Sequence, residues 1–207
     1  MSIFAKPQES NEIIDENVFP KVLFLHGLEG SPQGSKSVHL KKKWGAKSPA
    51  LRSHLLREAR TKSTTGEWKD IPKRDFERSW DAVYSDALSA VEYYNPDIVI
   101  GSSMGGALLA KMCLEGKWEG SCVFLAPAIK PLLGDVHLPK NKHAVWILGE
   151  ADDIVPNADN INHALDTGGQ LVISEADSHR LHKALETGLI DNAVITLLEI
   201  KSNSKPI

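Results

Sequence analysis

An apolar run that ends in a glycine-rich turn constrains the fold of this chain more than any other stretch. Residues 98–100 are Ile-Val-Ile, typical of a buried strand, and residues 101–105 follow as Gly-Ser-Ser-Met-Gly. Small and apolar residues at 106–110 then favour a helix. A strand, a sharp turn and a helix in this order place Ser103 at the tip of the turn, beside the free amides of a helix N-terminus. The alternative interpretation is an ordinary strand-to-helix turn in which the serine caps the helix.

Strands and helices are predicted to alternate along the chain. Apolar runs predict further strands at residues 21–25, 123–125, 144–148 and 170–173, with a short one at 46–49. Helical periodicity and helix-ending residues predict helices near residues 36–44, 76–94, 106–114, 157–165 and 181–200. Such alternation is typical of the α/β class with a mostly parallel sheet. A chain of 207 residues suits one domain, which we expect over residues 20–207.

Candidate catalytic side chains follow the predicted strands directly. His26, Ser103, Asp152 and His179 each come just after a strand. Because the carboxyl ends of parallel strands meet at one edge of the sheet, we expect these four side chains to converge there. This expectation rests on geometry and is therefore stronger than a match to any single motif.

A serine hydroxyl attacks a carbonyl at neutral pH only with a base beside it, and that base needs an orienting acid. With this type of turn the expected chain order is serine, acid, histidine. We therefore favour Ser103 as nucleophile, Asp152 as acid and His179 as base, because the last two lie in loops after strands. The remaining alternatives are Asp153 for the acid and His163 or His182 for the base.

Stabilising the negative oxygen that forms during such a reaction requires two backbone N–H groups. One is predicted to come from Met104, the residue after the serine, and the other from the loop after the first strand. Leu28 is our candidate in that loop. We interpret His26 as a residue that organises the loop by hydrogen bonds, since it precedes the serine and does not fit the expected order of the base.

At this point the chain resembles the α/β-hydrolase superfamily, and within it the small bacterial esterases of the YqiA type. The matching segments are Leu25-His26-Gly27-Leu28 with Ser31-Pro32, residues 101–106, Ala126-Pro127-Ala128, Gly149-x-x-Asp152-x-x-Val155-Pro156, and His179. The chain departs from the family pattern in carrying Asp153 beside Asp152, and Asp-Ser before His179 where a glycine is common.

This resemblance implies a reduced sheet of about six strands with helices on both faces. It also implies that a serine–histidine–aspartate triad cleaves a carboxylic ester or thioester of a small molecule through an acyl-enzyme, with no cofactor and no metal ion. Two other functions stay open. A hydrolase fold can serve as a catalytically silent binding module. The loop at residues 30–37 has some likeness to a phosphate-binding loop, although its glycines are one residue too close together.

Composition excludes several other classes of protein. A net charge of −3 gives no reason to expect a nucleic acid or an anionic membrane as partner. No run of 18 apolar residues predicts a membrane span. Cys113 and Cys122 are predicted to be buried apolar residues rather than a disulfide framework. Residues 1–19 are predicted to form a polar, acidic arm without a signal-peptide core, so the cytoplasm is the expected compartment.

Residues 50–74 are the least regular part of the sequence and carry an excess of positive charge. They hold seven Lys and Arg residues against three Asp and Glu residues. Because a long loop within a compact domain often has a function, we interpret this segment as a possible cationic cover over the site. The alternative is a solvated surface loop.

Overall fold

The computed structural model describes residues 20–203, and the polar arm expected at residues 1–19 lies outside them. Its sheet has five strands in the order β1-β2-β3-β4-β5, and all four neighbouring pairs are parallel. The strands are β1 (Val22–Leu25), β2 (Ile98–Ser102), β3 (Ser121–Leu125), β4 (Ala144–Gly149) and β5 (Gln170–Ser174). The α/β class with a parallel sheet is therefore confirmed.

Helices connect successive strands and continue beyond β5 to the end of the described part of the chain. They are α1 (Ser35–Trp44), α2 (Ser53–Thr61), the 3₁₀ helix η1 (Trp68–Asp70), α3 (Lys73–Tyr94), α4 (Met104–Leu114), α5 (Ile129–Leu133), α6 (Asn157–Thr167), α7 (His182–Glu186) and α8 (Leu189–Asn203). Between residues 20 and 203 no helix combines the length and the apolar character needed to cross a membrane.

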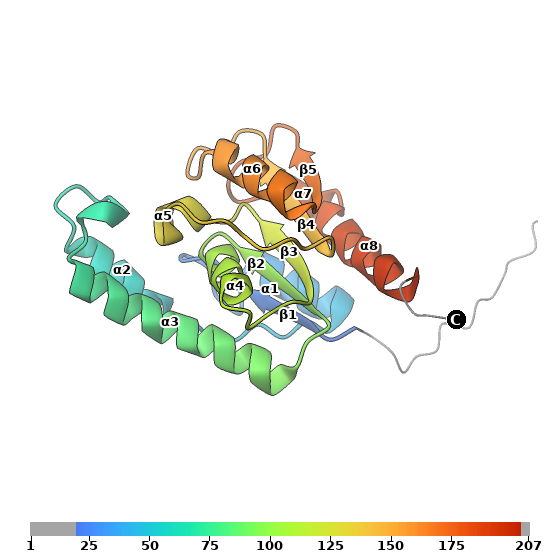
Figure 1. Ribbon diagram of the computed structural model, residues 1–207, viewed down its shortest axis with the longest axis horizontal. Helices are drawn as coiled ribbons and strands as arrows, with labels where there is room; N and C mark the ends of the chain where they lie inside the picture. The colour runs from blue at the N-terminus through green and yellow to red at the C-terminus, as the bar shows by residue number, and fades with distance from the viewer. Residues whose placement is uncertain (1–19, 204–207) are drawn as a thin grey trace, which may run out of the picture.

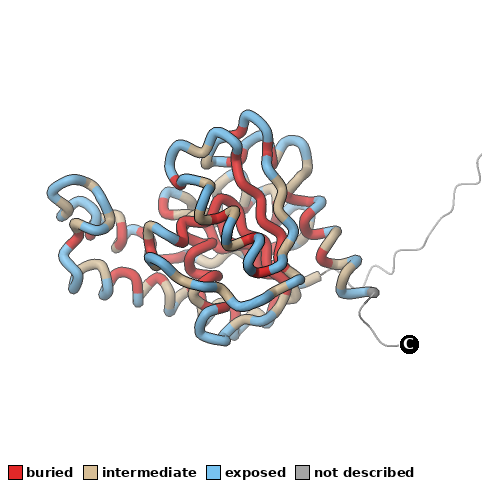
Figure 2. Tube along the Cα trace, turned by 45° about the horizontal axis from the view of Figure 1, so that its top comes forward, coloured by how far each residue is buried: buried red, intermediate tan, exposed pale blue. Residues whose placement is uncertain are grey.

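Helices cover both faces of the sheet, as the resemblance implied (Figure 1). Alternate strand residues point to opposite faces, so Leu23 and Leu25 join one apolar cluster while Val22 and Phe24 join another. Helices α2 to α6 contribute to the first cluster, and α1, α7 and α8 contribute to the second. The buried residues concentrate in the strands and in the inner sides of these helices (Figure 2). Burial on both faces explains why the strands are continuously apolar in sequence.

The sheet has one strand fewer than the six or so expected. The segment predicted as a strand at residues 46–49 forms only a single parallel bridge, between Lys47 and Leu23. Lys47 accepts a hydrogen bond from Phe24 N at 2.8 Å and donates one to Val22 O at 2.9 Å. Pro49 follows two residues later and has no N–H, so the pairing cannot extend along β1.

Residues 50–74 are more regular than the sequence suggested. Helix α2 buries Leu56 and Ala59, and it packs against α3. Together, α2, η1 and the start of α3 project from one side of the sheet as an arm (Figure 1). At its far end, η1 contacts α5, the short helix that follows β3.

The prediction of a single final helix over residues 181–200 is wrong. The chain forms α7 and α8 with a break between them at Thr187 and Gly188. Gly188 has a φ of 76°, a left-handed backbone conformation that glycine adopts without a steric penalty and that ends a helix.

Candidate active site

Ser103 lies in a strained turn between β2 and α4. Its φ of 52° and ψ of −115° are rare for a residue with a side chain, and such strain is common at functional sites. The turn is held by its own peptide groups. Ser103 N donates to Leu125 O at 2.9 Å, and Ser103 O accepts from Ala128 N at 3.0 Å. Both bonds tie the serine to β3 and the segment after it.

Two glycines allow the turn to be this sharp. A Cβ atom on Gly105 would overlap the carbonyl oxygen of Leu25, so α4 can approach β1 only where no side chain intervenes. A Cβ atom on Gly101 would lie 2.5 Å from the carbonyl oxygen of Gly105. The Gly-x-Ser-x-Gly spacing is therefore explained by close backbone approach on both sides of the serine.

The structure brings Ser103, His179 and Asp152 into one chain of hydrogen bonds. Ser103 Oγ lies 2.9 Å from His179 Nε2, and His179 Nδ1 lies 2.8 Å from Asp152 Oδ2. The side chain of Asp152 is fully buried and that of His179 is 13% exposed. Because a carboxylate only accepts, Nδ1 carries the proton, and in the neutral ring Nε2 is free to accept the serine proton.

Asp152 is held as a carboxylate by donors on both of its oxygens. Its Oδ1 accepts from Ile154 N at 3.0 Å and from Val155 N at 2.8 Å, in addition to the bond from His179 to Oδ2. Burial alone would raise the pKa of Asp152, but the hydrogen bonds from His179, Val155 and Ile154 outweigh it and lower that pKa. Asp152 therefore stays ionised at neutral pH.

None of the three alternative residues joins this arrangement. Asp153 is exposed, and His182 is exposed at the first residue of α7. His163 lies in α6, where its ring stacks on Trp146 with 6.4 Å between the ring centroids. The positions of the ring nitrogens and carboxylates therefore favour Asp152 and His179.

The loop that carries His179 depends on two residues that we did not single out from the sequence for this role. Asp177 is buried, and its Oδ2 accepts from Ser174 Oγ at 3.0 Å and from Ala184 N at 2.8 Å. Lys36 Nζ donates to Arg180 O at 2.5 Å. Asp177 was visible in sequence only as a departure from the family pattern, and the Lys36 contact joins residues 144 positions apart, so no local signal could reveal it.

The two candidate oxyanion amides occupy the expected places. Met104 is the first residue of α4, and Leu28 lies in the loop after β1. Among residues 20–203, neither amide N–H has a protein acceptor. Gly27 brings this loop against the serine, since a Cβ atom there would lie 3.2 Å from Ser103 Cβ. Both N–H groups are therefore without a protein acceptor in the described residues, and their role as oxyanion donors stays a prediction.

His26 organises the loop as the sequence suggested. Its ring is buried, and Nδ1 donates to Gly27 O at 2.9 Å. Burial lowers the pKa of His26, and the nearby positive charge of Arg57 lowers it further. His26 is therefore neutral at pH 7 and, among the hydrogen bonds of the described residues, makes none with Ser103.

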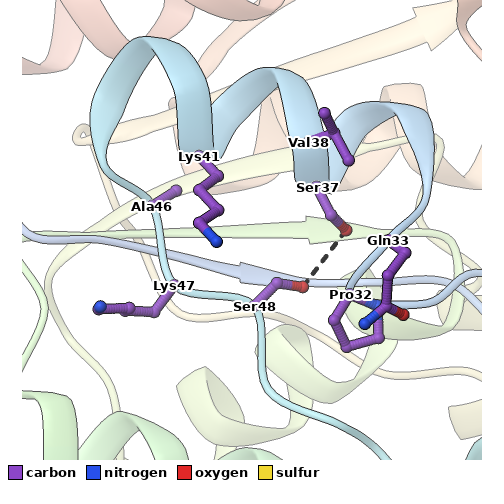
Figure 3. Close-up of a pocket in the computed structure, with 8 residues that line it drawn as sticks. All are labelled: Pro32, Gln33, Ser37, Val38, Lys41, Ala46, Lys47 and Ser48. Carbon is purple, nitrogen blue, oxygen red and sulfur yellow. Dashed lines mark hydrogen bonds between the residues drawn. The ribbon is translucent and has the colours of Figure 1, made fainter.

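The phosphate-loop interpretation of residues 30–37 finds little support. Its lysine, Lys36, donates to the Arg180 carbonyl instead of being free for a phosphate. Ser37 Oγ donates to Ser31 O at 2.8 Å and lies 3.3 Å from Ser48 Oγ. A hollow of about 410 Å³ does lie beside this loop, between α1 and residues 46–48, and no triad residue lines it (Figure 3).

Solved structures similar to this chain share one fold. A Xanthomonas campestris pv. campestris protein assigned to the alpha/beta hydrolase superfamily is 20% identical, with a TM-score of 0.59 over 89% of this chain and 99% of its own. Est1E from Butyrivibrio proteoclasticus, solved with ferulic acid, is 15% identical, with a TM-score of 0.64 over 87% and 88%. A Bacillus cereus carboxylesterase is 16% identical, with a TM-score of 0.52 over 84% and 88%.

Comparison by sequence finds neither a matching protein-family model nor a matching curated protein. Identities below 25% carry information about the fold, and the three-dimensional match extends over most of the chain in each case. The parallel sheet, the strained serine turn after β2 and the match to these structures lead to one conclusion. This chain has the α/β-hydrolase fold.

Proposed function

We propose that this protein is a serine hydrolase that cleaves a carboxylic ester or thioester of a small molecule through an acyl-enzyme. The hydrogen-bonded chain from Ser103 through His179 to Asp152 carries the proposal. The similar structures support it, since one of them is a carboxylesterase. We also propose that the protein is most similar to the small bacterial esterases of the YqiA type and that it is located in the cytoplasm.

In the first half of the reaction, Ser103 Oγ attacks the acyl carbon while His179 Nε2 accepts its proton. Asp152 stabilises the imidazolium that forms, and the amides of Leu28 and Met104 stabilise the oxyanion. The tetrahedral intermediate then collapses as His179 gives its proton to the leaving alcohol or thiol. The products of this half are the free leaving group and an ester on Ser103.

In the second half, water attacks the acyl-enzyme. His179 accepts a proton from the water, a second oxyanion forms at the same two amides, and Ser103 leaves with the proton returned by His179. The carboxylic acid is released and the serine hydroxyl is restored. This sequence consumes one water for each ester bond and needs no redox partner.

Labelling with a fluorophosphonate tests the proposal, together with p-nitrophenyl esters and acyl-thioesters of graded chain length. We expect one label per chain, located on Ser103 by peptide mass spectrometry, and hydrolysis of at least one substrate. Ser103→Ala should abolish the label and leave only residual turnover, with an unchanged melting temperature.

Ser102→Ala is the matched control, because Ser102 is the adjacent serine and is buried at the end of β2. It should keep both the label and the turnover. A wild-type protein that takes no label and cleaves none of the substrates would contradict the proposal and favour a catalytically silent binding module. Wild-type turnover in Ser103→Ala would contradict the assignment of the nucleophile.

A further inference from the structure

Three hydrogen bonds hold the loop that carries the Leu28 amide. Two come from side chains and one comes from a backbone amide across the turn. Gly27 O accepts from His26 Nδ1 at 2.9 Å and from Gly30 N at 3.0 Å. Leu28 O accepts from Arg57 Nη1 at 2.6 Å. Because peptide groups are planar, these bonds hold the two peptide planes on either side of the Leu28 Cα atom.

Arg57 comes from the arm and reaches this loop from a fixed position on α2. The same Nη1 lies 3.2 Å from Ser53 Oγ, one helical turn earlier, so the guanidinium is held at its own helix. The residue is half-buried. Its charge also acts on the neighbouring ring of His26, whose pKa is lowered mainly by burial and to a smaller extent by Arg57, against the raising effect of the hydrogen bond to Gly27.

Most other cations of residues 50–74 are engaged elsewhere. Arg52 pairs with Asp86 at 2.8 Å, and Lys62 pairs with Asp75 at 3.1 Å. Arg60 lies over the ring of Trp68, 5.2 Å from its centroid. In the part of the chain that the structure describes, Arg57 is the cation of this segment that hydrogen-bonds to the loop beside Ser103.

We propose that Arg57 is a positioning residue, which orients the Leu28 amide toward the oxyanion by holding the Leu28 carbonyl. The proposal rests on the proposed function, because the oxyanion arises in that reaction. The bonds to Gly27 O orient the Leu28 N–H, which lies in the same peptide plane, and Arg57 anchors the next peptide of the loop to α2. Removing the guanidinium leaves the loop held only at Gly27, so the loop shifts more freely and carries the Leu28 amide away from its best alignment.

The consequence is specific to the transition state. The oxyanion carries more charge than the carbonyl oxygen of the bound ester. A misaligned amide therefore reduces the stabilisation of the transition state more than it reduces the affinity for the substrate. We therefore expect Arg57→Met to lower kcat by about 10- to 100-fold with KM within about twofold. Arg57→Lys should recover part of the loss, since an ammonium offers a donor without the rigid fork of the guanidinium.

Arg52→Met is the matched control. Arg52 lies five residues earlier, and it joins the start of α2 to α3 through Asp86 and Ala82 O without touching the loop of Leu28. Loosening the arm in this way should lower the melting temperature and leave kcat unchanged. Equal losses of kcat in Arg52→Met and Arg57→Met would overturn the proposal, because the arm as a whole would then be responsible.

A second measurement does not depend on activity. The amide of Gly30 donates across the same loop, so its hydrogen exchange reports how firmly the loop is held. We expect faster exchange at Gly30 in Arg57→Met than in wild type or Arg52→Met. If Arg57→Met changes neither the exchange at Gly30 nor kcat, the proposal is overturned. If exchange at Gly30 is faster in Arg57→Met but the wild-type protein hydrolyses no ester, only the proposed function is contradicted.

Discussion

Asp152 and Asp153 are neighbours in sequence with opposite surroundings. Asp152 is buried against His179, whereas Asp153 is exposed to solvent. Asp152→Asn should lower kcat by about 10²- to 10⁴-fold, because an amide favours the wrong tautomer of His179 and cannot stabilise its cation. Asp153→Asn should stay within about twofold of wild type.

Steady-state kinetics on a p-nitrophenyl ester compares the two variants, with melting temperatures to confirm that both fold. A greater loss in Asp153→Asn than in Asp152→Asn would show that the acid has been assigned to the wrong residue. The comparison is sharp because both substitutions remove one negative charge from the same loop.

At the scale of single elements, the junction of β2 and α4 depends on close backbone approach. Gly105→Ala should destabilise the fold by at least about 2 kcal/mol, because the new methyl group overlaps the carbonyl of Leu25 in the neighbouring strand. Gly116→Ala is the control, since Gly116 has a φ of 63° and open space around it. Backbone strain alone should then remove about 1 kcal/mol.

Urea unfolding measures both free energies. If Gly105→Ala is no less stable than Gly116→Ala, steric overlap does not control this junction. Fluorophosphonate labelling provides a second comparison, since Gly116→Ala should keep a reactive Ser103.

The arm formed by α2, η1 and the start of α3 remains our candidate for a cover over the site. If its cations face the substrate, an anionic acyl or leaving group should have a higher kcat/KM than a neutral group of the same shape. The preference should weaken as salt rises through about 0.15 M, where screening acts over roughly 8 Å.

A charge-matched pair of esters at low and high salt tests the cover, in wild type and in Arg57→Ala/Arg60→Ala. Because Arg57 also holds the Leu28 loop, the ratio of kcat/KM between the two esters is the informative quantity rather than either value alone. Equal ratios under all four conditions would leave the arm as a surface feature without a role in selectivity.

At the scale of the whole molecule, one buried carboxylate joins α1 to α8, the first and last helices of the described chain, which lie on the same face of the sheet. Asp191, in the first turn of α8, accepts from Trp44 Nε1 at 2.7 Å, Lys43 Nζ at 2.9 Å and His39 Nε2 at 3.0 Å, all on α1. Burial alone would raise the pKa of Asp191, but these three partners outweigh it and lower that pKa. The ionised form is therefore favoured in the folded state.

This shift predicts how stability depends on pH. The unfolded chain takes up a proton at Asp191 first, so the stabilisation is present above roughly pH 4 and is lost as the pH falls below it. Asp191→Asn should be less stable than wild type by about 1–3 kcal/mol at pH 7. The difference in free energy of unfolding between Asp191→Asn and wild type should be smaller at pH 3.

Urea unfolding of wild type and Asp191→Asn at both pH values measures this difference, with the exposed Asp153→Asn as control. A constant gap between wild type and Asp191→Asn from pH 7 to pH 3 would argue against a linkage through this carboxylate.

Local pattern was enough to predict most of the elements, because strands buried on both faces are continuously apolar and helices repeat every 3.6 residues. It failed at α2, a short and highly charged helix that is marginal in isolation and gains stability by packing on α3. It also failed at Gly188, which divides the predicted final helix into α7 and α8, and at residues 46–49, which form a single bridge instead of a strand. The conformation of α2 depends on a neighbouring helix, whereas the break at Gly188 follows from the left-handed backbone of the glycine itself.

The sequence by itself determined the parallel α/β architecture, the serine turn and the choice of Ser103, Asp152 and His179 as candidates, since residues that follow parallel strands must meet at one edge. Only the tertiary structure paired His179 with Asp152 rather than Asp153, and joined Arg57 to Leu28, Lys36 to Arg180 and α1 to Asp191. These contacts join residues 27 to 148 positions apart. Their distances depend on how whole helices pack, which no local spacing in the chain records.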